Sequence, residues 1–321
     1  MLMQTVEVFH CSKASILVTT NEEPRHHQET PKGSKTMQDK IIRLLEDYAE
    51  EKHRPDDSQY TAIDLHNALK VAAEAGASLY EVEEIALSSG ITPTRFSRNQ
   101  RILTTSDQKQ LHLAHVAIVG LGGLGGGVTE LLARTGVGNL TLIDGDSFDE
   151  SNLNRQLLST VSNIGTPKAT VAGERVLNIN PATRVTTHLQ FLEPHNGYDL
   201  LAGVDLAIDC LDTISDRFTL EQVCKKRKIP MISAAIAGKS GQVTVISPES
   251  TGLKNIYGER KNAPKRGIET SIGTLSFTAA YMAAVQCAEA VNIILKNDSP
   301  LKNTLLFTDL SDYSVERIQT N

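Results

Sequence analysis

The spacing of hydrophobic positions predicts a helical unit over residues 37–92. Ile41, Leu45 and Tyr48 recur at i, i+4 and i+7, and a second set with similar spacing begins at Leu65. This pattern places apolar side chains on one face of a helix. We therefore expect a small bundle of three helices here, serving as a structural cover or as a docking module.

The third of these helices has a recognisable start. Ser78 is followed three residues later by Glu81, which is the spacing of a capping box, and Gly90 closes the segment. Residues 1–36 show no sustained periodicity and contain Pro24 and a His26–His27 pair. We interpret them as a flexible extension, in which the two histidines are solvated side chains.

After residue 92 the pattern changes to short apolar runs that alternate with helical segments. Residues 116–119 form such a run, and Gly120, Gly122 and Gly125 then give G-x-G-x-x-G. A helix from about residue 128 ends at Gly136, and a second strand over residues 140–143 ends in Asp144. Strand, glycine turn, helix, strand and acid are the order of a nucleotide-binding βαβ unit.

This order has a physical meaning for a bound nucleotide. Glycine lets the turn approach a phosphate, and the N-terminus of a helix presents free N–H groups and a positive dipole end. Asp144 lies 19 positions after Gly125, where its carboxylate can accept hydrogen bonds from a ribose. The stretch by itself leaves open whether the nucleotide is NAD or ATP.

Polar residues gather directly after the second strand. Asn152, Asn154, Arg155 and Gln156 follow its end, where open α/β sheets bind ligands. Thr166 and Pro167 predict a helix start with Thr166 as cap, and this places Lys168 in the first turn. A lysine there opposes the helix dipole, which indicates an anionic partner.

The rest of the chain continues the alternation. Strands are expected over 185–189, 204–209, 229–234, 242–247 and 305–307, with helices over 213–226 and 272–295 and a polar loop over 248–271. The tail is polar. Arg95, Arg98 and Arg101 recur at helical spacing and are expected to share one face. We predict an α/β fold with a doubly wound, Rossmann-like, mainly parallel sheet over residues 93–321 and helices on both faces.

Composition narrows the class of protein. A net charge of −6 argues against a general nucleic-acid binder, and no apolar run reaches the roughly 18 residues that span a bilayer. The first residues lack the features of a signal peptide, so a cytoplasmic location is expected. The four cysteines form no C-x-x-C pair, so we expect no structural zinc. Cys210 and Cys224 are expected to be small buried residues.

Five motifs in order resemble those of the ThiF/MoeB/HesA adenylyltransferases, relatives of the ubiquitin-activating enzymes. They are RFSRN at 95–99, GLGGLG at 120–125, LIDGD at 142–146, SNLNRQ at 151–156 with GTPK at 165–168, and DCLD at 209–212. The resemblance covers the chain from about Arg95 to its end.

The resemblance implies ATP-dependent adenylation of the C-terminal glycine of a small ubiquitin-fold sulfur carrier ending in Gly-Gly. It implies Arg98, Arg155, Lys168 and Asp212 as catalytic residues, with Asp212 placing Mg²⁺ through ATP. Arg98 would reach the ATP of a partner subunit, so a homodimer is implied, and a separate protein would donate sulfur. The expected ATP-binding residues are Gly120, Gly122, Gly125, Asp144, Ser151, Asn152, Leu153, Asn154, Arg155, Gln156, Lys168, Asp212 and Thr213.

Three features depart from the family pattern. The chain lacks the zinc-binding C-x-x-C pairs, Thr213 stands where Asn is common, and loop 248–271 has no cysteine. A covalent carrier–enzyme intermediate is therefore not expected.

Other functions stay open from sequence. They are a related tRNA-modifying dehydratase, an NAD-dependent oxidoreductase, and a binding module that has lost its activity. A basic loop with Lys254, Lys261, Lys265 and Arg266 would suit tRNA, whereas the cation set has no use in a dinucleotide site.

Overall fold

The computed structural model describes residues 32–54, 56–264 and 266–320. Most of the expected extension, with its histidine pair, lies outside these ranges. Helix α1 (Lys32–Tyr48) begins inside the segment that the sequence assigns to the extension. The start of the N-terminal unit therefore differs by a few residues from the expected one.

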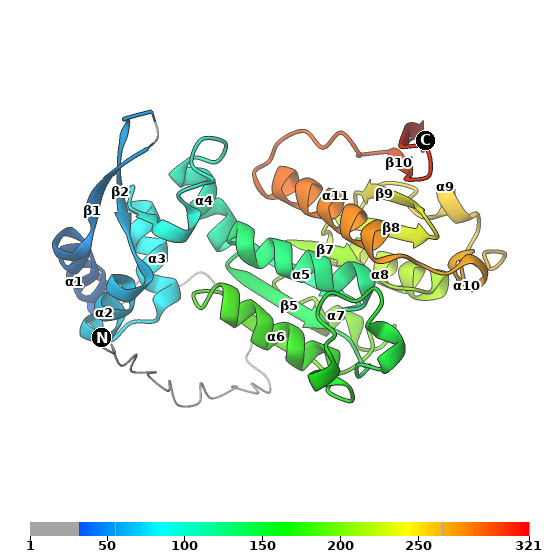
Figure 1. Ribbon diagram of the computed structural model, residues 1–321, viewed down its shortest axis with the longest axis horizontal. Helices are drawn as coiled ribbons and strands as arrows, with labels where there is room; N and C mark the ends of the chain where they lie inside the picture. Colours follow the sequence, from blue (N-terminus) through cyan, green and yellow to red (C-terminus); the bar gives the residue numbers. More distant parts are fainter. Residues whose placement is uncertain (1–31, 55, 265, 321) are drawn as a thin grey trace, which may run out of the picture.

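One eight-stranded sheet organises the larger part of the chain (Figure 1). Its order is β11-β10-β9-β8-β7-β4-β5-β6; β8, β7, β4, β5 and β6 run parallel, and β9 to β11 add antiparallel neighbours. The strands are β4 (His115–Val119), β5 (Asn139–Ile143), β6 (Arg184–His188), β7 (Leu206–Asp209), β8 (Met231–Ala237), β9 (Ser240–Ile246), β10 (Thr304–Asp309) and β11 (Ser314–Gln319). The predicted α/β class is confirmed. The polar tail, for which the sequence predicted no strand, forms the edge strand β11, most of whose side chains are exposed.

Helices cover both faces of the sheet. On one face lie α5 (Gly123–Thr135), α6 (Lys168–Ile179) and α11 (Ser276–Ile294), and on the other lie α7 (Gly197–Leu200) and α8 (Ile214–Arg227). Strand β4 contributes to both cores, since Val116 and Ile118 point to the first and Ala117 and Val119 to the second. This explains why the strand reads as a continuous apolar run.

Two helix starts differ from expectation. Helix α5 begins at Gly123, five residues before the expected start, because glycine-rich sequence has low helix propensity and resembles a loop. Its end at Gly136 is confirmed, with a left-handed φ of 96°. Helix α6 begins at Lys168 with Pro167 as cap, and no side chain caps it, so the expected Thr166 cap is wrong.

Helix α11 is long and apolar enough to span a membrane by length and composition. It packs instead against α5 and the sheet, and its buried face includes the polar residues Thr278, Gln286 and Glu289. Gln286 hydrogen-bonds the backbone of β7 through its amide, 2.9 Å from Asp209 O. The helix is therefore a partly buried core helix.

The N-terminal unit is a mixed α/β structure at one end of the molecule (Figure 1). Helices α1, α2 (Leu65–Ala75) and α3 (Leu79–Ser88) form as expected, and the Ser78–Glu81 capping box is confirmed. A three-stranded sheet of β1 (Glu50–His53), β2 (Gln59–Ile63) and β3 (Thr92–Pro93) was not predicted. The three expected helices are confirmed, and the strands were missed because they are short and largely polar.

Arg95 joins this unit to the large sheet. Its guanidinium pairs with the fully buried Glu83 of α3 and donates to Asn180 at the end of α6, with 2.7 Å between Nη2 and Oδ1. The expected arginine face does not form, because a 3₁₀ turn at Thr94–Phe96 and further turns replace the helix. Arg101 pairs with Asp56, and Arg98 is exposed.

His112, at the end of α4 (Thr105–Leu113), makes this junction sensitive to pH. Its ring stacks on Tyr80 with centroids 4.2 Å apart, and Nε2 lies 3.0 Å from the Tyr80 carbonyl oxygen. Burial lowers the pKa of His112 from 6.5 to about 4. The unfolded chain therefore binds the proton more readily, and stability falls as the pH drops from 6.5 towards 4.

We expect this loss to reach about 3 kcal/mol at pH 4. Urea unfolding at pH values between 7.5 and 4 measures the free energy of unfolding of the wild type and of His112→Gln. The variant should lack the pH-dependent loss that His112 causes. His195→Gln is the matched control, because His195 is exposed. An equal pH dependence of wild type and His112→Gln would contradict the assignment.

Candidate functional site

A cavity of about 540 Å³ opens at the carboxyl ends of the parallel strands. It lies where the strand order reverses: the chain passes from β4 to β5 on one side and returns to β7 on the other. Such switch points are where open α/β sheets bind ligands. Of the expected residues, those lining the cavity are Gly120, Gly122, Asp144, Asn154, Arg155, Gln156, Lys168 and Asp212.

The glycine turn is packed too closely for side chains. Gly120 has a φ of 86°, and a Cβ there would lie 2.7 Å from the Cys210 carbonyl oxygen. A Cβ on Gly125 would lie 1.8 Å from Gly120 O, so Gly125 serves the shape of the turn and does not line the cavity. Asp144 fastens the same turn, because its Oδ2 accepts the Leu121 N–H at 2.7 Å. Burial raises the pKa of Asp144.

Replacing Gly125 with alanine should therefore disturb the turn and the cavity together. We expect a loss of about 1–3 kcal/mol in the free energy of unfolding, because the new methyl group overlaps the backbone. Nucleotide binding, measured by calorimetry, should weaken in parallel. Gly123→Ala is the control, since its Cβ would meet nothing closer than 3.5 Å. Equal stability of the two variants would contradict this role for Gly125.

Two cations reach the cavity from different elements. Lys168 in the first turn of α6 has a side chain that is 8% exposed, and its Nζ lies 3.0 Å from Asp146 Oδ2. Arg155 donates from Nη1 to Ser151 O and Asn154 Oδ1, each at 2.9 Å. Neither acceptor carries a charge. These acceptors do not neutralise the positive charge of the Arg155 guanidinium, which can therefore attract an anionic ligand. The partner of Lys168, Asp146, was not predicted from the sequence.

Gln156 supplies an unused polar group beside the glycine turn. It is buried, and its Oε1 has no hydrogen-bond partner among the described residues. Its amide lies within 4.0 Å of the place where a Cβ on Gly122 would be. A buried polar atom without a partner has an energetic cost, and a ligand donor would relieve it.

Asp212 and Thr213 follow strand β7. Asp212 is exposed at the cavity wall, and Thr213 caps α8, accepting the Asp216 N–H at 3.2 Å. Asn and Thr can both cap a helix, so the departure from the family pattern at position 213 preserves this local structure. Thr213 itself does not line the cavity.

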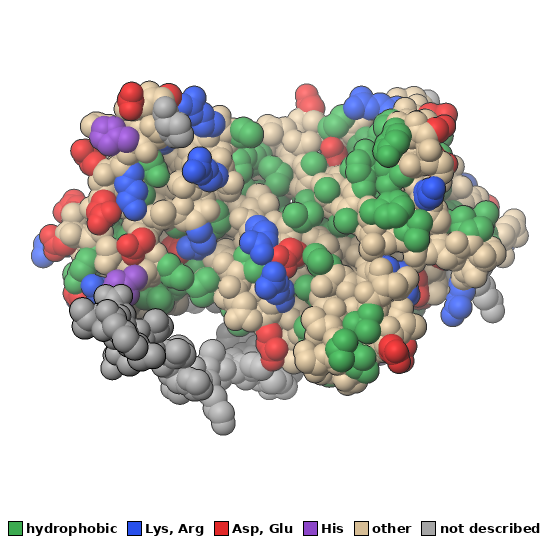
Figure 2. Space-filling model, viewed as in Figure 1, with side chains coloured by type: hydrophobic (Ala, Val, Ile, Leu, Met, Phe, Trp, Pro, Cys, Tyr) green, Lys and Arg blue, Asp and Glu red, His purple; other side chains and the backbone are tan. Residues whose placement is uncertain are grey.

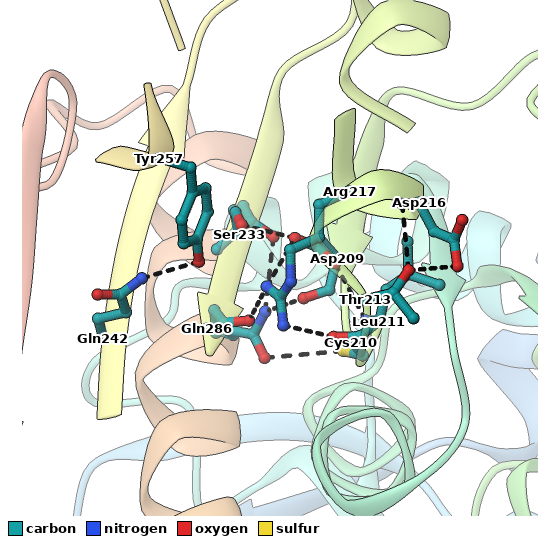
Figure 3. A network of polar contacts seen from close by, with 12 residues as sticks. Asp209, Cys210, Leu211, Thr213, Asp216, Arg217, Ser233, Gln242, Tyr257 and Gln286 are labelled. Atoms are coloured by element: carbon teal, nitrogen blue, oxygen red, sulfur yellow. Dashed lines mark hydrogen bonds and ion pairs between the residues drawn. The ribbon is translucent and has the colours of Figure 1, made fainter. Parts of the chain in front are cut away.

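Arg217 is a cavity residue that sequence reasoning missed. Its Nη1 lies 3.0 Å from Oδ2 of Asp209, which is fully buried and also accepts from the Ser233 hydroxyl. The guanidinium further donates to the carbonyl oxygens of Leu211 and Ala234 (Figure 3). These partners come from β7, β8 and the loop after β7, and no local sequence pattern reveals their convergence.

Some expected residues lie away from the cavity lining. Ser151, Leu153 and Arg98 are exposed outside it, and Asn152 is buried with its Oδ1 accepting the Asp149 N–H at 3.1 Å. Asn152 thereby stabilises the turn that carries Arg155. Residues Asp146, Phe191, Asp216, Arg266 and Glu269 line the cavity and were not expected there.

The described cysteines are buried thiols, as expected for Cys210 and Cys224. Cys210 lines the cavity, and burial raises its pKa well above the ordinary value. Burial also raises the pKa of Cys287 to about 12 and that of Cys224 further. These thiols stay protonated near neutral pH and are poor nucleophiles. Cys11 lies outside the described residues.

Comparison with known proteins identifies a family for this chain. Residues 96–321 match the ThiF family. The SAMP-activating enzyme E1 of Haloferax volcanii is 31% identical over 214 residues, covering 66% of this chain and 78% of that protein. The sulfur carrier protein ThiS adenylyltransferase of Escherichia coli is 31% identical over 216 residues, covering 66% and 86%.

A solved structure shows the same fold. Escherichia coli MccB with ATP is similar with a TM-score of 0.62 at 21% identity, over 71% of this chain and 72% of that one. The family match extends over more than half of the chain, and it includes every expected cavity residue. The chain therefore belongs to the ThiF family and is an E1-like adenylyltransferase.

Proposed function

We propose that this enzyme adenylates the C-terminal glycine carboxylate of a small ubiquitin-fold sulfur carrier protein and releases pyrophosphate. The observation that carries the proposal is the convergence of the glycine turn, Arg155 and Lys168 on one cavity at the switch point of a ThiF-family sheet. The names of two relatives, which activate SAMP and adenylate ThiS, support a carrier protein as the substrate class.

The chemistry requires stabilisation of charge more than a general base. A carboxylate oxygen of the carrier attacks the α-phosphorus of ATP, the bond to the β-phosphate breaks, and pyrophosphate leaves with that electron pair. Negative charge spreads over the phosphate oxygens in the transition state. Lys168 and Arg155 provide fixed positive charge, and a preorganised donor requires no rearrangement during the reaction.

The other cavity residues suit the remaining parts of ATP. Gly120 and Gly122 allow the backbone to approach the phosphates, and Asp144 stands at the end of β5, where a ribose can lie. Asp212 is exposed, and its carboxylate has no partner among the described residues, which fits Mg²⁺ held mainly through phosphates. Mg²⁺ supplies further neutralisation of the phosphate charge when bound.

Arg98 supports a homodimer within this proposal. It is exposed and has no partner among the described residues, and it lies outside the cavity of its own chain. If it contacts ATP, as the resemblance implies, it does so in a second copy. Mixing the Arg98→Ala and Lys168→Ala variants should then restore part of the activity in mixed dimers. In such a dimer, the site of the Arg98→Ala subunit keeps its own Lys168 and receives Arg98 from the other subunit.

The high pKa values of the described cavity and core thiols favour release of the acyl-adenylate to a separate sulfur donor. A thioester on these cysteines would require a thiolate that burial disfavours. The proposal therefore assigns adenylation alone to the described part of this chain.

ATP–pyrophosphate exchange with candidate carriers ending in Gly-Gly tests the proposal. We expect exchange with at least one carrier and none when its last glycine is deleted. Absence of exchange with every carrier, together with salt-sensitive binding of tRNA, would instead favour carboxylate activation on a tRNA base.

A further inference from the structure

The segment that carries Arg98, residues 95–101, is held by a part of the chain that lies outside the family match. That match begins at residue 96, and the N-terminal unit, residues 32–92, precedes it. Figure 2 shows acidic and basic side chains interspersed on the visible face of this unit. Three of its charged side chains reach the segment, and they are Arg54, Asp56 and Glu83.

The contact at the start of the segment is a buried ion pair with two hydrogen bonds. Both Nη1 and Nη2 of Arg95 donate to the Glu83 carboxylate, with 2.7 Å between Nη1 and Oε1. Glu83 is fully buried, and the Arg95 side chain is 22% exposed. A bidentate pair fixes the orientation of the guanidinium as well as its position. This end of the segment is therefore firmly attached to α3.

The contacts at the other end of the segment come from the connection between β1 and β2. Arg54 donates from Nη2 to Gln100 Oε1 at 3.1 Å, and its guanidinium carbon lies 4.5 Å from the centre of the Tyr60 ring. Asp56 pairs with Arg101, but both side chains are largely exposed to water, so this pair contributes little. Arg54 is therefore the main contact at this end.

Arg98 lies between these two attached ends. Phe96 is buried against the end of α5, where a Cβ on Gly136 would lie 2.7 Å from its ring, and Asn99 donates to Gln108 Oε1 at 3.3 Å. Arg98 itself is exposed and has no partner among the described residues. The direction in which its guanidinium points therefore depends on how the ends of the segment are held.

We propose that the N-terminal unit positions Arg98 for the active site of the second subunit, with Glu83 and Arg54 as the positioning residues. The two contacts hold the segment at both ends, so the exposed guanidinium approaches the partner's nucleotide in one orientation. This inference rests on the proposed function, and it gives a part in the reaction to a unit outside the family match. Glu83 and Arg54 act through Arg98 and touch no substrate.

Glu83→Gln should lower kcat of carrier-dependent ATP–pyrophosphate exchange by about tenfold, because a shift of about 1 Å in a positioned group can cost up to 10²-fold. The KM for the carrier should stay unchanged. Arg54→Ala leaves no buried charge unpaired and should lower kcat less, and Arg54→Lys should recover part of that loss. The matched controls are Glu84→Gln and Arg43→Ala, because both residues belong to the N-terminal unit and neither is bonded to residues 95–101.

Mixed dimers distinguish the positioning of Arg98 from a general structural role. Glu83→Gln mixed with Lys168→Ala should regain activity, because the site of the Glu83→Gln subunit keeps Lys168 and receives a correctly held Arg98. Glu83→Gln mixed with Arg98→Ala should regain none, since neither subunit then supplies a positioned arginine. Exchange by the double variant Glu83→Gln with Arg98→Ala should stay within about threefold of Arg98→Ala alone.

Hydrogen–deuterium exchange tests the attachment without turnover. The N–H groups of Ile102 and Leu103 donate to the Asn99 carbonyl oxygen, so their exchange reports opening of the segment. We expect the peptide covering residues 96–103 to exchange about fivefold or more faster in Glu83→Gln and in Arg54→Ala than in the wild type, with β4 unchanged.

Unchanged deuterium uptake by residues 96–103 in both variants would overturn the inference. Equal relative losses of pyrophosphate exchange in the wild-type and Arg98→Ala backgrounds would also overturn it, as would failure of Glu83→Gln to complement Lys168→Ala where Arg98→Ala does. Wild-type enzyme without exchange on any carrier would overturn the proposed function. Faster deuterium uptake in the variants would still support attachment of the segment by the N-terminal unit.

Discussion

Lys168→Ala should reduce carrier-dependent ATP–pyrophosphate exchange by about 10²–10³-fold, the usual effect of removing one preorganised stabilising group. The Lys168 side chain is 8% exposed, so little water competes for its charge. The loss should appear mainly in kcat, because the charge on the phosphate oxygens develops in the transition state. Steady-state exchange at varied ATP and carrier concentrations measures it.

The fold should tolerate this change. Asp146, the partner left behind, is 55% exposed and can be hydrated. Lys52→Ala is the control, because Lys52 also pairs with an acid, Glu50 at 3.6 Å, but lies in the N-terminal unit away from the switch-point cavity. Exchange within a factor of three of the wild type in Lys168→Ala would remove Lys168 from the mechanism.

Asp209→Ala should lower the free energy of unfolding by about 3–5 kcal/mol, because it leaves the Arg217 guanidinium buried without a counter-charge. Asp209 is fully buried, and the Arg217 side chain is only 6% exposed. Ser233 and the Leu211 N–H, 3.0 Å from Asp209 Oδ1, would lose their acceptor as well. Urea unfolding at neutral pH measures the change.

A double variant separates the charge from the cavity that the smaller side chain creates. Asp209→Ala with Arg217→Met should be more stable than Asp209→Ala alone, since no unpaired charge remains. Asp39→Ala is the control for an exposed aspartate and should change stability by less than about 0.5 kcal/mol. A loss below about 1 kcal/mol in Asp209→Ala would show that the ion pair contributes little.

Local chemistry explains why much of the fold could be predicted from sequence. Residues 116–119 form β4 because an apolar run buried on both faces has few alternatives, and Gly136 ends α5 because glycine readily adopts the left-handed conformation. Lys168 and Arg155 could be predicted as site residues because their motifs come after the second strand of the nucleotide-binding unit in the sequence.

The features that were missed depend on partners distant in sequence. The β1–β3 sheet has largely polar strands, and β3 pairs with β2 through only two residues, Thr92 and Pro93. Arg217 acquires its place from Asp209, Leu211 and Ala234, which only the folded sheet brings together. The spacing of the arginines at 95–101 did not produce a helix. Turns replace the helix there, and Arg95 pairs with Glu83, which is distant in sequence.

In the proposed reaction, the switch-point cavity joins AMP to the C-terminal carboxylate of a carrier protein. Intact mass spectrometry of a Gly-Gly carrier, after incubation with the enzyme, ATP and Mg²⁺ and rapid acid quenching, tests it most directly. The proposed mechanism predicts an AMP adduct on the last glycine that is absent with Lys168→Ala enzyme. AMP found on no carrier, or an adduct that forms equally with the variant, would contradict it.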